Sequence, residues 1–182
     1  MNFFSKFKFC PSCGSSKFIQ NNEKSKRCEE CDFIYYINPS AATASFIRNS
    51  SGELLVCRRA HEPEKGTLDL PGGFADLDET IEQCAIREIT EEIGVKPISI
   101  NFLFTLPNEY LYSGLIVPTM DVFFEAKLDD NAQIQANDDV EECFFLPIRE
   151  VNPALFGMKS VRKAVKIYID AQKSEEKKKY FA

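Results

Sequence analysis

The sequence predicts an α/β domain preceded by a small cysteine-rich segment. Residues 1–37 contain four of the seven cysteines, arranged as two CxxC pairs, and few aliphatic residues. Asn38-Pro39-Ser40 then interrupts the chain, and beyond it apolar runs of strand length are interspersed with two helical patterns. We therefore expect two domains, residues 1–37 and 38–182.

The strands of the second domain follow from short apolar runs bounded by turn residues. Asn49-Ser50-Ser51-Gly52 is typical of a hairpin turn, so it should join a strand at 41–47 to a returning strand at 53–58. A short strand should lead into Pro71-Gly72-Gly73. Further strands are expected at 98–105, 120–127 and 143–146. In the second of these, alternate residues form one apolar face: Met120, Val122, Phe124 and Ala126.

Two helices complete the expected fold. Thr80 and Gln83 have the spacing of a capping box, and Gly94 is a natural helix stop. Apolar residues between them recur at helical spacing. A closing amphipathic helix is expected at about 159–171.

Composition excludes several classes of function. The chain has 22 basic and 28 acidic residues, a net charge of −6, which weighs against a protein held on nucleic acid by a basic surface. His61 is the single histidine, so a multi-histidine metal site is excluded. No run approaches the 18 or so apolar residues of a membrane span, and the N-terminus lacks the apolar core of a signal peptide. We expect a cytoplasmic protein without a membrane partner.

The paired cysteines predict a structural zinc site. Cys10 and Cys13 are separated from Cys28 and Cys31 by 14 residues, a spacing typical of a tetrahedral Cys₄ site. Four protein ligands leave no position for a catalytic water. The alternative is a redox CxxC or unrelated free thiols. Charges in this segment nearly balance, and its many aromatic residues suggest packing against the next domain or in a homodimer, rather than nucleic-acid binding.

An acidic helix carries the strongest functional signal. Glu88, Glu91 and Glu92 stand at i, i+3 and i+4, so they share one helix face and repel one another. Mg²⁺ or Mn²⁺ would remove this penalty, whereas a plain solvated acidic face is the alternative. The glycines of Pro71-Gly72-Gly73 let the backbone approach closely and offer carbonyls to a metal. Together these features indicate metal-assisted chemistry on a phosphate compound.

The same stretch resembles a known signature. The pattern G-x5-E-x7-R-E-U-x-E-E-x-G-U, with U an aliphatic residue, is filled at every defined position by Gly73, Glu79, Arg87, Glu88, Ile89, Glu91, Glu92, Gly94 and Val95. This is the box of the Nudix hydrolase family. The resemblance implies a Nudix α/β/α sandwich with a mixed sheet, and hydrolysis of a nucleoside diphosphate linked to another group.

The resemblance also implies roles for individual residues. Glu88, Glu91 and Glu92 would be metal ligands, joined by the Gly72 carbonyl. Arg87 would orient the acidic cluster together with Glu79, and Glu88 is the first choice for general base.

One acidic residue beyond the box is assigned in the same way. Glu142 precedes an aromatic-x-Pro sequence and matches the position at which the family often completes its site. Plain surface charge is the alternative for Glu142.

The zinc ribbon followed by the box resembles the Nudix branch that acts on NADH, FAD or ADP-ribose. The S-Q-P-W-P-F-P array of the NADH enzymes is absent, which argues against reduced-nicotinamide specificity. Tyr110 and Tyr112 could stack a base, or could be two side chains on one strand face. Arg58 and Arg59 could reach a phosphate, or one or both could pair with acidic residues of the box.

We therefore expect a Mg²⁺- or Mn²⁺-dependent hydrolase that acts on a small nucleotide and releases a nucleoside monophosphate. One alternative is a pyrophosphohydrolase that removes modified nucleoside triphosphates. The other is a nucleotide-sensing regulator that binds without hydrolysing.

Overall fold

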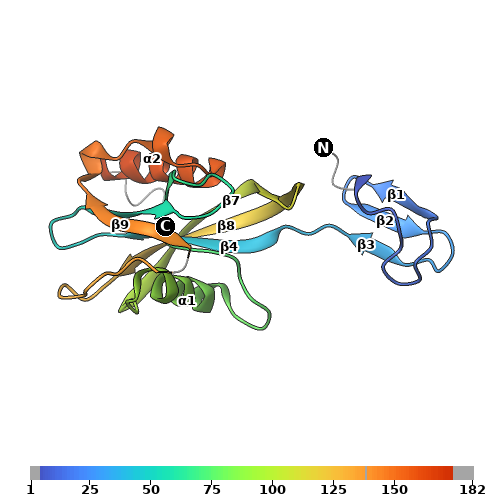
Figure 1. Ribbon diagram of the computed structural model, residues 1–182, viewed down its shortest axis with the longest axis horizontal. Coiled ribbons are helices and arrows are strands. Elements are labelled where there is room, and N and C mark those ends of the chain that lie inside the picture. Colours follow the sequence, from blue (N-terminus) through green and yellow to red (C-terminus); the bar gives the residue numbers. More distant parts are fainter. Residues whose placement is uncertain (1–4, 138, 174–182) are drawn as a thin grey trace. The chain divides into compact units, whose positions relative to one another are not determined.

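The computed structural model describes residues 5–137 and 139–173 of the chain and divides into two compact units (Figure 1). The first comprises Met1–Pro39 and Glu109–Pro118, and the second comprises Ser40–Asn108 and Thr119–Ala182. The boundary expected after residue 37 stays a prediction.

The N-terminal part of the first unit is a three-stranded antiparallel sheet with little apolar core. Its strands β1 (Phe18–Asn22), β2 (Ser25–Cys28) and β3 (Ile34–Tyr36) lie in the order β1-β2-β3. Cys10, Phe18 and Cys28 are buried, with Phe7 and Tyr35 packed against them. So small a core supplies little burial free energy, which is why such segments depend on a metal or disulfides.

Two three-stranded sheets belong to the second unit, except for the segment Glu109–Pro118, which is assigned to the first. One has the order β4-β8-β7, and its strands β4 (Ser40–Ile47) and β8 (Leu115–Lys127) run parallel, with β7 (Ser99–Tyr112) at its edge. The other has the order β6-β5-β9 and is antiparallel, with β6 (Leu68–Asp69), β5 (Leu54–Arg59) and β9 (Val140–Leu146).

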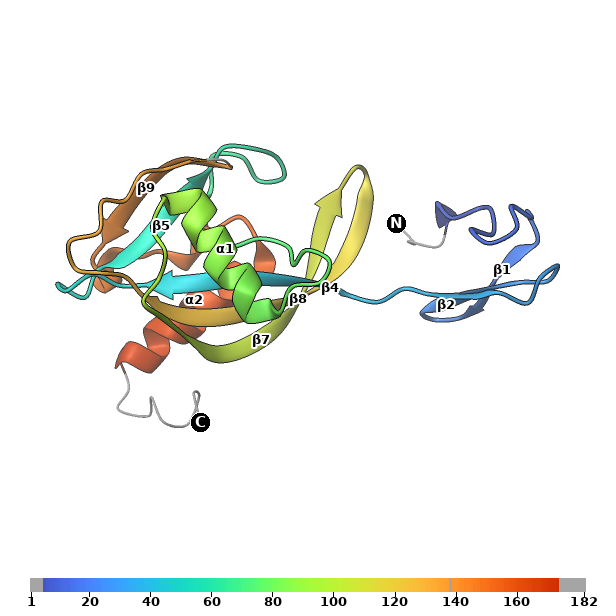
Figure 2. The same cartoon turned by 90° about the horizontal axis from the view of Figure 1, so that it is seen from below.

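Helices α1 (Ile81–Ile93) and α2 (Lys159–Lys173) lie on opposite sides of these strands (Figures 1 and 2). Short 3₁₀ turns at Ile148–Glu150 and Pro153–Leu155 precede α2. The predicted α/β sandwich of mixed strand direction is thereby confirmed. Within the part of the chain that the structure describes, neither helix has the length and apolar character of a transmembrane span.

The expected hairpin between the first two strands of this unit is wrong in its pairing. The turn itself forms, since Gly52 donates to the Asn49 carbonyl at 2.9 Å and Asn49 donates to the Glu53 carbonyl at 3.1 Å. Beyond the single bridge between Arg48 and Leu54, however, β4 and β5 separate into different sheets. Each of them pairs instead with a strand distant in sequence, β8 or β9.

Strand β8 is buried on both of its faces rather than on one. Val122 and Phe124 pack with Ala85 of α1, as the predicted alternation requires. Phe123 is also buried and contacts Phe46, whose ring stacks on Tyr168 of α2 with centroids 4.0 Å apart. Met120, at the start of the predicted apolar face, is half exposed. A strand sandwiched between two helices has apolar side chains on both faces.

Strands β7, β8 and β9 extend beyond their predicted limits. β7 continues through Pro107 to Tyr112 and turns into β8 at Ser113 and Gly114, whose φ values are 49° and 75°. Two successive positive φ values match the type I′ turn, which suits the twist of a hairpin.

Candidate functional site

The acidic helix α1 begins and ends where local chemistry dictates. The Thr80 hydroxyl accepts from the Gln83 N–H at 3.2 Å, and the Gln83 side chain accepts from the Thr80 N–H at 2.7 Å. Gly94 ends the helix in the left-handed conformation, with its N–H on the Thr90 carbonyl at 3.0 Å. The predicted capping box and stop are confirmed. Because Ile89 and Ile93 are fully buried, the register of the glutamates on the helix is fixed.

Arg87 is the centre of the acidic cluster. Its Nη1 donates to Glu88 Oε1 at 2.8 Å and to Glu91 Oε2 at 2.9 Å. Its Nε and Nη2 donate to both oxygens of Glu79, at 3.1 and 2.8 Å, and Nη2 also reaches the Phe74 carbonyl at 3.0 Å. One guanidinium therefore holds three carboxylates and the loop before the helix, which a planar five-donor fork can do and a lysine cannot.

These contacts shift the pKa values of the groups involved. Hydrogen bonds from Arg87, with a second from the Asp76 N–H, lower the pKa of Glu79 to about 2. The carboxylates around Arg87, Glu79 first, raise the pKa of its guanidinium. The pair thus stays ionised across the whole range in which the protein is expected to work, so Glu79 serves to hold Arg87.

Glu92 occupies a different environment from Glu88 and Glu91. Its side chain is buried, and its Oε2 accepts from the Gly72 N–H at 3.0 Å. Burial raises the pKa of Glu92 well above its usual value, only partly offset by this hydrogen bond. A buried carboxylate with one hydrogen bond is poorly stabilised in its charged form, and a bound cation would stabilise it.

The segment Pro71–Gly73 lies against strand β4 and faces Glu92 with its middle residue. The Ser45 N–H donates to the Pro71 carbonyl and the Thr43 N–H to the Gly73 carbonyl, each at 2.8 Å. A Cβ on Gly72 would meet the Thr43 carbonyl oxygen at 2.1 Å, so only glycine fits. The outer two carbonyls are therefore bound to β4, whereas the Gly72 N–H points to α1.

Glu88 packs against the same segment. A Cβ on Gly73 would lie 2.5 Å from the Glu88 carboxyl group, so glycine is required for this approach too. Burial raises the pKa of Glu88, and the contact with Arg87 works in the opposite direction. The three glutamates of the predicted ligand set thus lie at the Gly72-Gly73 turn or on the Arg87 fork beside it.

Arg58 and Glu142 are brought together by the pairing of β5 with β9. They stand opposite each other in the antiparallel register, and Arg58 Nε donates to Glu142 Oε1 at 2.7 Å. Arg58 also donates to the Gly66 carbonyl at 2.8 Å. Arg58 thus pairs with a carboxylate outside the box and not with one of the box acids that the sequence suggested as partners.

Sequence reasoning missed a second pair, Arg59 with Asp69. Arg59 Nη1 donates to Asp69 Oδ2 at 2.7 Å, and the Leu70 N–H donates to Asp69 Oδ1 at 2.9 Å. Burial raises the pKa of Asp69, and Arg59 opposes the shift. This ion pair braces the strand that leads into the glycine turn. The sequence signal that could have indicated this pair is the position of Asp69 between two leucines, Leu68 and Leu70, where a carboxylate is expected to be buried and paired.

Tyr110 and Tyr112 lie on one face of β7, with ring centroids 6.5 Å apart and planes 25° apart. They belong to the first unit, whereas the acidic helix belongs to the second. The arrangement matches the strand-face alternative and leaves a stacking role as a prediction.

The cysteine cluster of the ribbon has the geometry of a tetrahedral metal site. The four sulfur atoms of Cys10, Cys13, Cys28 and Cys31 all lie within 4.8 Å of one another. Cys10 and Cys31 are 3.7 Å apart, and Cys13 and Cys28 are 3.6 Å apart. Tetrahedral zinc with bonds of about 2.3 Å requires sulfur separations of about 3.8 Å. The donor set and its spacing therefore fit zinc.

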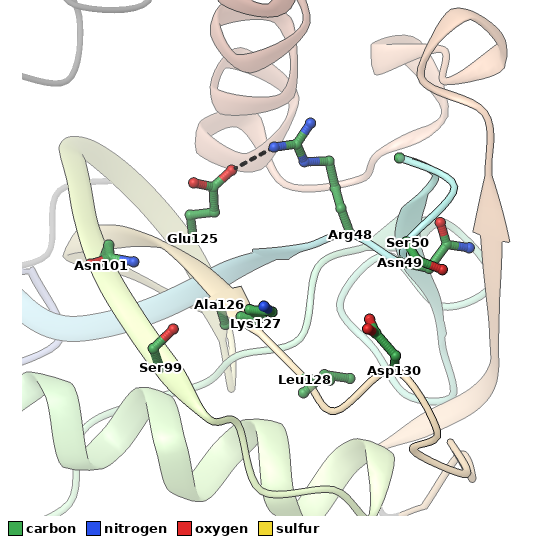
Figure 3. A pocket seen from close by; sticks show the side chains of 11 residues that line it. Arg48, Asn49, Ser50, Ser99, Asn101, Glu125, Ala126, Lys127, Leu128 and Asp130 are labelled. Carbon is green, nitrogen blue, oxygen red and sulfur yellow. Dashed lines mark hydrogen bonds and ion pairs between the residues drawn. The ribbon is translucent and has the colours of Figure 1, made fainter.

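A pocket of about 570 Å³ elsewhere in the second unit contains none of the predicted site residues (Figure 3). Arg48 and Glu125 on its wall form an ion pair at 3.2 Å, and the Tyr168 hydroxyl donates to the same Glu125 oxygen at 2.9 Å. These two charges are therefore paired with each other within the fold.

The chain is similar to known proteins in sequence and in fold. The family model described as NUDIX domain matches residues 38–166. An NAD-capped RNA hydrolase NudC of Vibrio vulnificus is 29% identical over 100 residues, which cover 55% of this chain and 38% of the relative. The chain thus spans less than half the length of that relative.

Two solved structures show the same fold. A Nudix hydrolase from Nitrosomonas europaea is 23% identical, with a TM-score of 0.70 and coverage of 91% of this chain and 92% of that one. The NUDIX domain of Shewanella oneidensis NrtR, complexed with ADP ribose, is 20% identical, with a TM-score of 0.59 and coverage of 75% and 88%. At these identities the likeness is one of fold.

Proposed function

Since this chain belongs to the NUDIX domain family, we propose that it is a divalent-metal-dependent diphosphohydrolase acting on a dinucleotide or ADP-ribose-type substrate. The bond cleaved is the diphosphate of a nucleoside diphosphate linked to another group, and a nucleoside monophosphate is released. NADH, FAD and ADP-ribose are the compounds to test first.

The observation that carries this proposal is the placement of Glu88 and Glu92 against a glycine turn, with Glu91 beside them on the Arg87 fork. Arg87 holds Glu88 and Glu91 on one fork, and Glu92 is buried against the Gly72 N–H. Packing these carboxylates together is costly unless a cation binds, because each of them repels the others. A purely structural face would leave Glu92 in solvent, whereas here it is buried.

The donor set fits a hard divalent cation. Glu88, Glu91 and Glu92 would hold Mg²⁺ or Mn²⁺, both of which prefer oxygen ligands. The Gly72 carbonyl is a further ligand in this proposal, because the carbonyls on either side of it are bound to β4. The metal would neutralise diphosphate charge and lower the pKa of a bound water.

The other residues position the reacting groups. Glu88 Oε1 is held by Arg87, and its second oxygen, Oε2, is the proposed acceptor of the proton from the attacking water. Burial raises the pKa of Glu88, the direction that makes a carboxylate a stronger base. Glu142 is proposed as a further catalytic carboxylate, held by Arg58 in the absence of substrate.

The substrate side of the proposal rests on fewer observations. Arg58, released from Glu142, would bind a substrate phosphate, and the stacked pair Tyr110 and Tyr112 would bind a base or flavin. The Vibrio vulnificus relative is named for NAD-capped RNA and the Shewanella oneidensis structure contains ADP ribose. Both ligands contain an ADP-ribosyl group, which supports a substrate of that type.

A hydrolysis panel tests the proposal. Zinc-loaded full chain with Mg²⁺ would be offered ADP-ribose, FAD, NADH, NAD-capped RNA, and normal and oxidised nucleoside triphosphates, with AMP release as the readout. Glu92→Gln removes a proposed ligand, and Glu82→Gln is the matched control, an exposed glutamate on the same helix at a position that the box leaves undefined. We expect Mg²⁺-dependent AMP release from one or more ADP-ribosyl compounds, lost in Glu92→Gln and retained in Glu82→Gln.

Three other outcomes would contradict the proposal. Pyrophosphate release from triphosphates alone would indicate the pool-cleaning enzyme. Binding of ADP-ribose without turnover in Mg²⁺ would indicate a sensing protein. Equal turnover in wild type and Glu92→Gln would remove the ligand assignment.

Two further properties are proposed on the sequence. The ribbon cysteines would bind one structural zinc ion, for which their spacing in the structure is suitable. A homodimer would be detected as a doubled mass in light scattering.

A further inference from the structure

Two cysteines outside the ribbon face each other across the β5–β9 pair. Cys57 and Cys143 are directly opposed in the antiparallel register, between the pairs Val56–Phe144 and Arg58–Glu142. Their sulfur atoms are 3.0 Å apart. The two residues are 86 positions apart in the sequence, and their spacing gives no sign of this contact.

The distance separates this pair from a metal-binding arrangement. Two pairs of sulfur atoms in the ribbon cluster are 3.6 and 3.7 Å apart, the spacing that a central ion requires. The Cys57–Cys143 contact is shorter. Within residues 5–137 and 139–173, the group of three or more metal-type ligands with suitable spacing is the ribbon cluster, so a third ligand for this pair is lacking.

Backbone geometry permits a covalent bond here. Directly opposed residues of antiparallel strands have Cα atoms about 4.5–5.5 Å apart. Disulfides span Cα separations of about 4.4–6.8 Å. The two side chains already point at each other, so the sulfurs need to approach by about 1 Å without movement of the strands.

The two thiols differ in access. Cys57 is buried at 2% exposure, whereas Cys143 is only partly buried. A small oxidant would therefore reach Cys143 first, and Cys57 would be placed to attack the product.

We propose that Cys57 and Cys143 form an oxidisable dithiol that closes to a disulfide with a hydroperoxide as oxidant. The Cys143 thiol gives up its proton, the thiolate attacks one peroxide oxygen and the O–O bond breaks, so that a sulfenic acid forms and the leaving hydroxide takes up that proton to become water. The Cys57 thiolate then attacks the Cys143 sulfur, the S–O bond breaks, and hydroxide leaves and takes up a proton. In total two thiols lose two electrons and two protons, and hydrogen peroxide becomes two waters.

The cross-link would join the two strands beside the Arg58–Glu142 pair. It would close a long loop in the unfolded chain, and a loop of that length reduces denatured-state entropy substantially. The oxidised protein should therefore unfold at a higher urea concentration than the reduced protein.

Peptide mapping tests the proposal directly. The zinc-loaded full chain would be treated with hydrogen peroxide, alkylated and digested with trypsin without reduction. Cleavage after lysine and arginine places Cys57 in residues 49–58, Cys143 in residues 128–149 and the buried Cys84 in residues 66–87. These three peptides contain none of the ribbon cysteines, so oxidation of the ribbon does not change the masses that are measured for them. Cys84 is an internal control for non-specific oxidation.

We expect the peptide 49–58 linked to 128–149, released by a phosphine reductant, with 66–87 still alkylated. The urea midpoint should rise on oxidation of the wild type and stay constant in Cys143→Ser. Sulfinic acid on Cys143 with Cys57 still alkylated would overturn the proposal. So would full alkylation of both residues at peroxide concentrations that oxidise the unfolded chain.

Discussion

The Glu92 carboxylate accepts a hydrogen bond from the Gly72 N–H at 3.0 Å, and it does so in a buried position. This contact joins the last turn of α1 to the turn that precedes the helix. It also keeps a charge where the fold alone cannot stabilise it well, because burial raises the pKa of Glu92. Such a group is typical of a site in which stability has been traded for function.

The pH dependence of stability should follow from Glu92. Its pKa in the folded state lies above the usual 4.5, so between these values the folded chain binds more protons than the unfolded chain. Without divalent metal, the free energy of unfolding should therefore fall as pH rises from about 4.5 through the raised pKa.

Glu92→Gln should remove this fall in the free energy of unfolding at higher pH, because the uncharged amide oxygen still accepts the hydrogen bond from the Gly72 N–H. Urea unfolding at about pH 5 and about pH 8 measures the effect, and we expect the variant to be about 1–2 kcal/mol more stable than wild type at the higher pH. A variant less stable than wild type at both pH values would show that the ionised Glu92 is well solvated or paired.

Arg87→Lys should lower turnover by at least about tenfold, since an ammonium group cannot hold the three carboxylates of Glu79, Glu88 and Glu91 on one fork. Steady-state kinetics with saturating Mg²⁺ measure the turnover of Arg87→Lys relative to that of wild type. Arg162→Lys, in α2, is the matched control for loss of guanidinium hydrogen bonds to backbone carbonyls. Equal turnover in the two variants would mean that Arg87 holds the loop and has no influence on the site.

Alanine at the two glycines should give different defects. At Gly72 the added Cβ meets the Thr43 carbonyl of β4, which is backbone, so the fold should lose stability by several kcal/mol. At Gly73 it meets the Glu88 carboxyl, the end of a side chain that can turn away. Gly73→Ala should therefore remain folded and lose turnover. Thermal melts and hydrolysis rates distinguish the two, and similar melting temperatures for both variants would contradict the packing described.

Zinc removal should unfold the ribbon and leave the second unit folded. The buried residues in the ribbon are few, so its sheet depends on the cysteine cluster. Hydrogen exchange after chelation should show loss of protection in β1 and β2 and retention in β4 and β5, whose buried side chains belong to a larger core. A single zinc ion per chain should be found before chelation and none in Cys28→Ser. Protection that survives chelation would show that the cysteines are not zinc ligands.

Features set by neighbours in sequence were predictable. Thr80, Gln83 and Gly94 define α1 because their hydrogen bonds reach only three or four residues. The glutamate face of α1 followed from helical periodicity in the same way. The turn at Asn49 was also correctly predicted, because its bonds are local.

Features set by distant pairing were not predictable from spacing. The partner of β4 is β8 and that of β5 is β9, so the local turn between β4 and β5 does not decide the sheet. The same register brings Arg58 to Glu142 and Cys57 to Cys143. The strand expected at 98–105 continues through Pro107 as β7, because β7 lies at the edge of its sheet and an edge strand tolerates proline.

The central claim is that Glu92 is a ligand of the metal on which hydrolysis depends. The most direct measurement is the rate of AMP release from the best ADP-ribosyl substrate over a Mg²⁺ titration, for wild type, Glu92→Gln and Glu82→Gln. We predict that Glu82→Gln follows wild type, whereas Glu92→Gln loses turnover by about a hundredfold or more although it folds. Turnover of Glu92→Gln within about twofold of wild type at every Mg²⁺ concentration would contradict the claim.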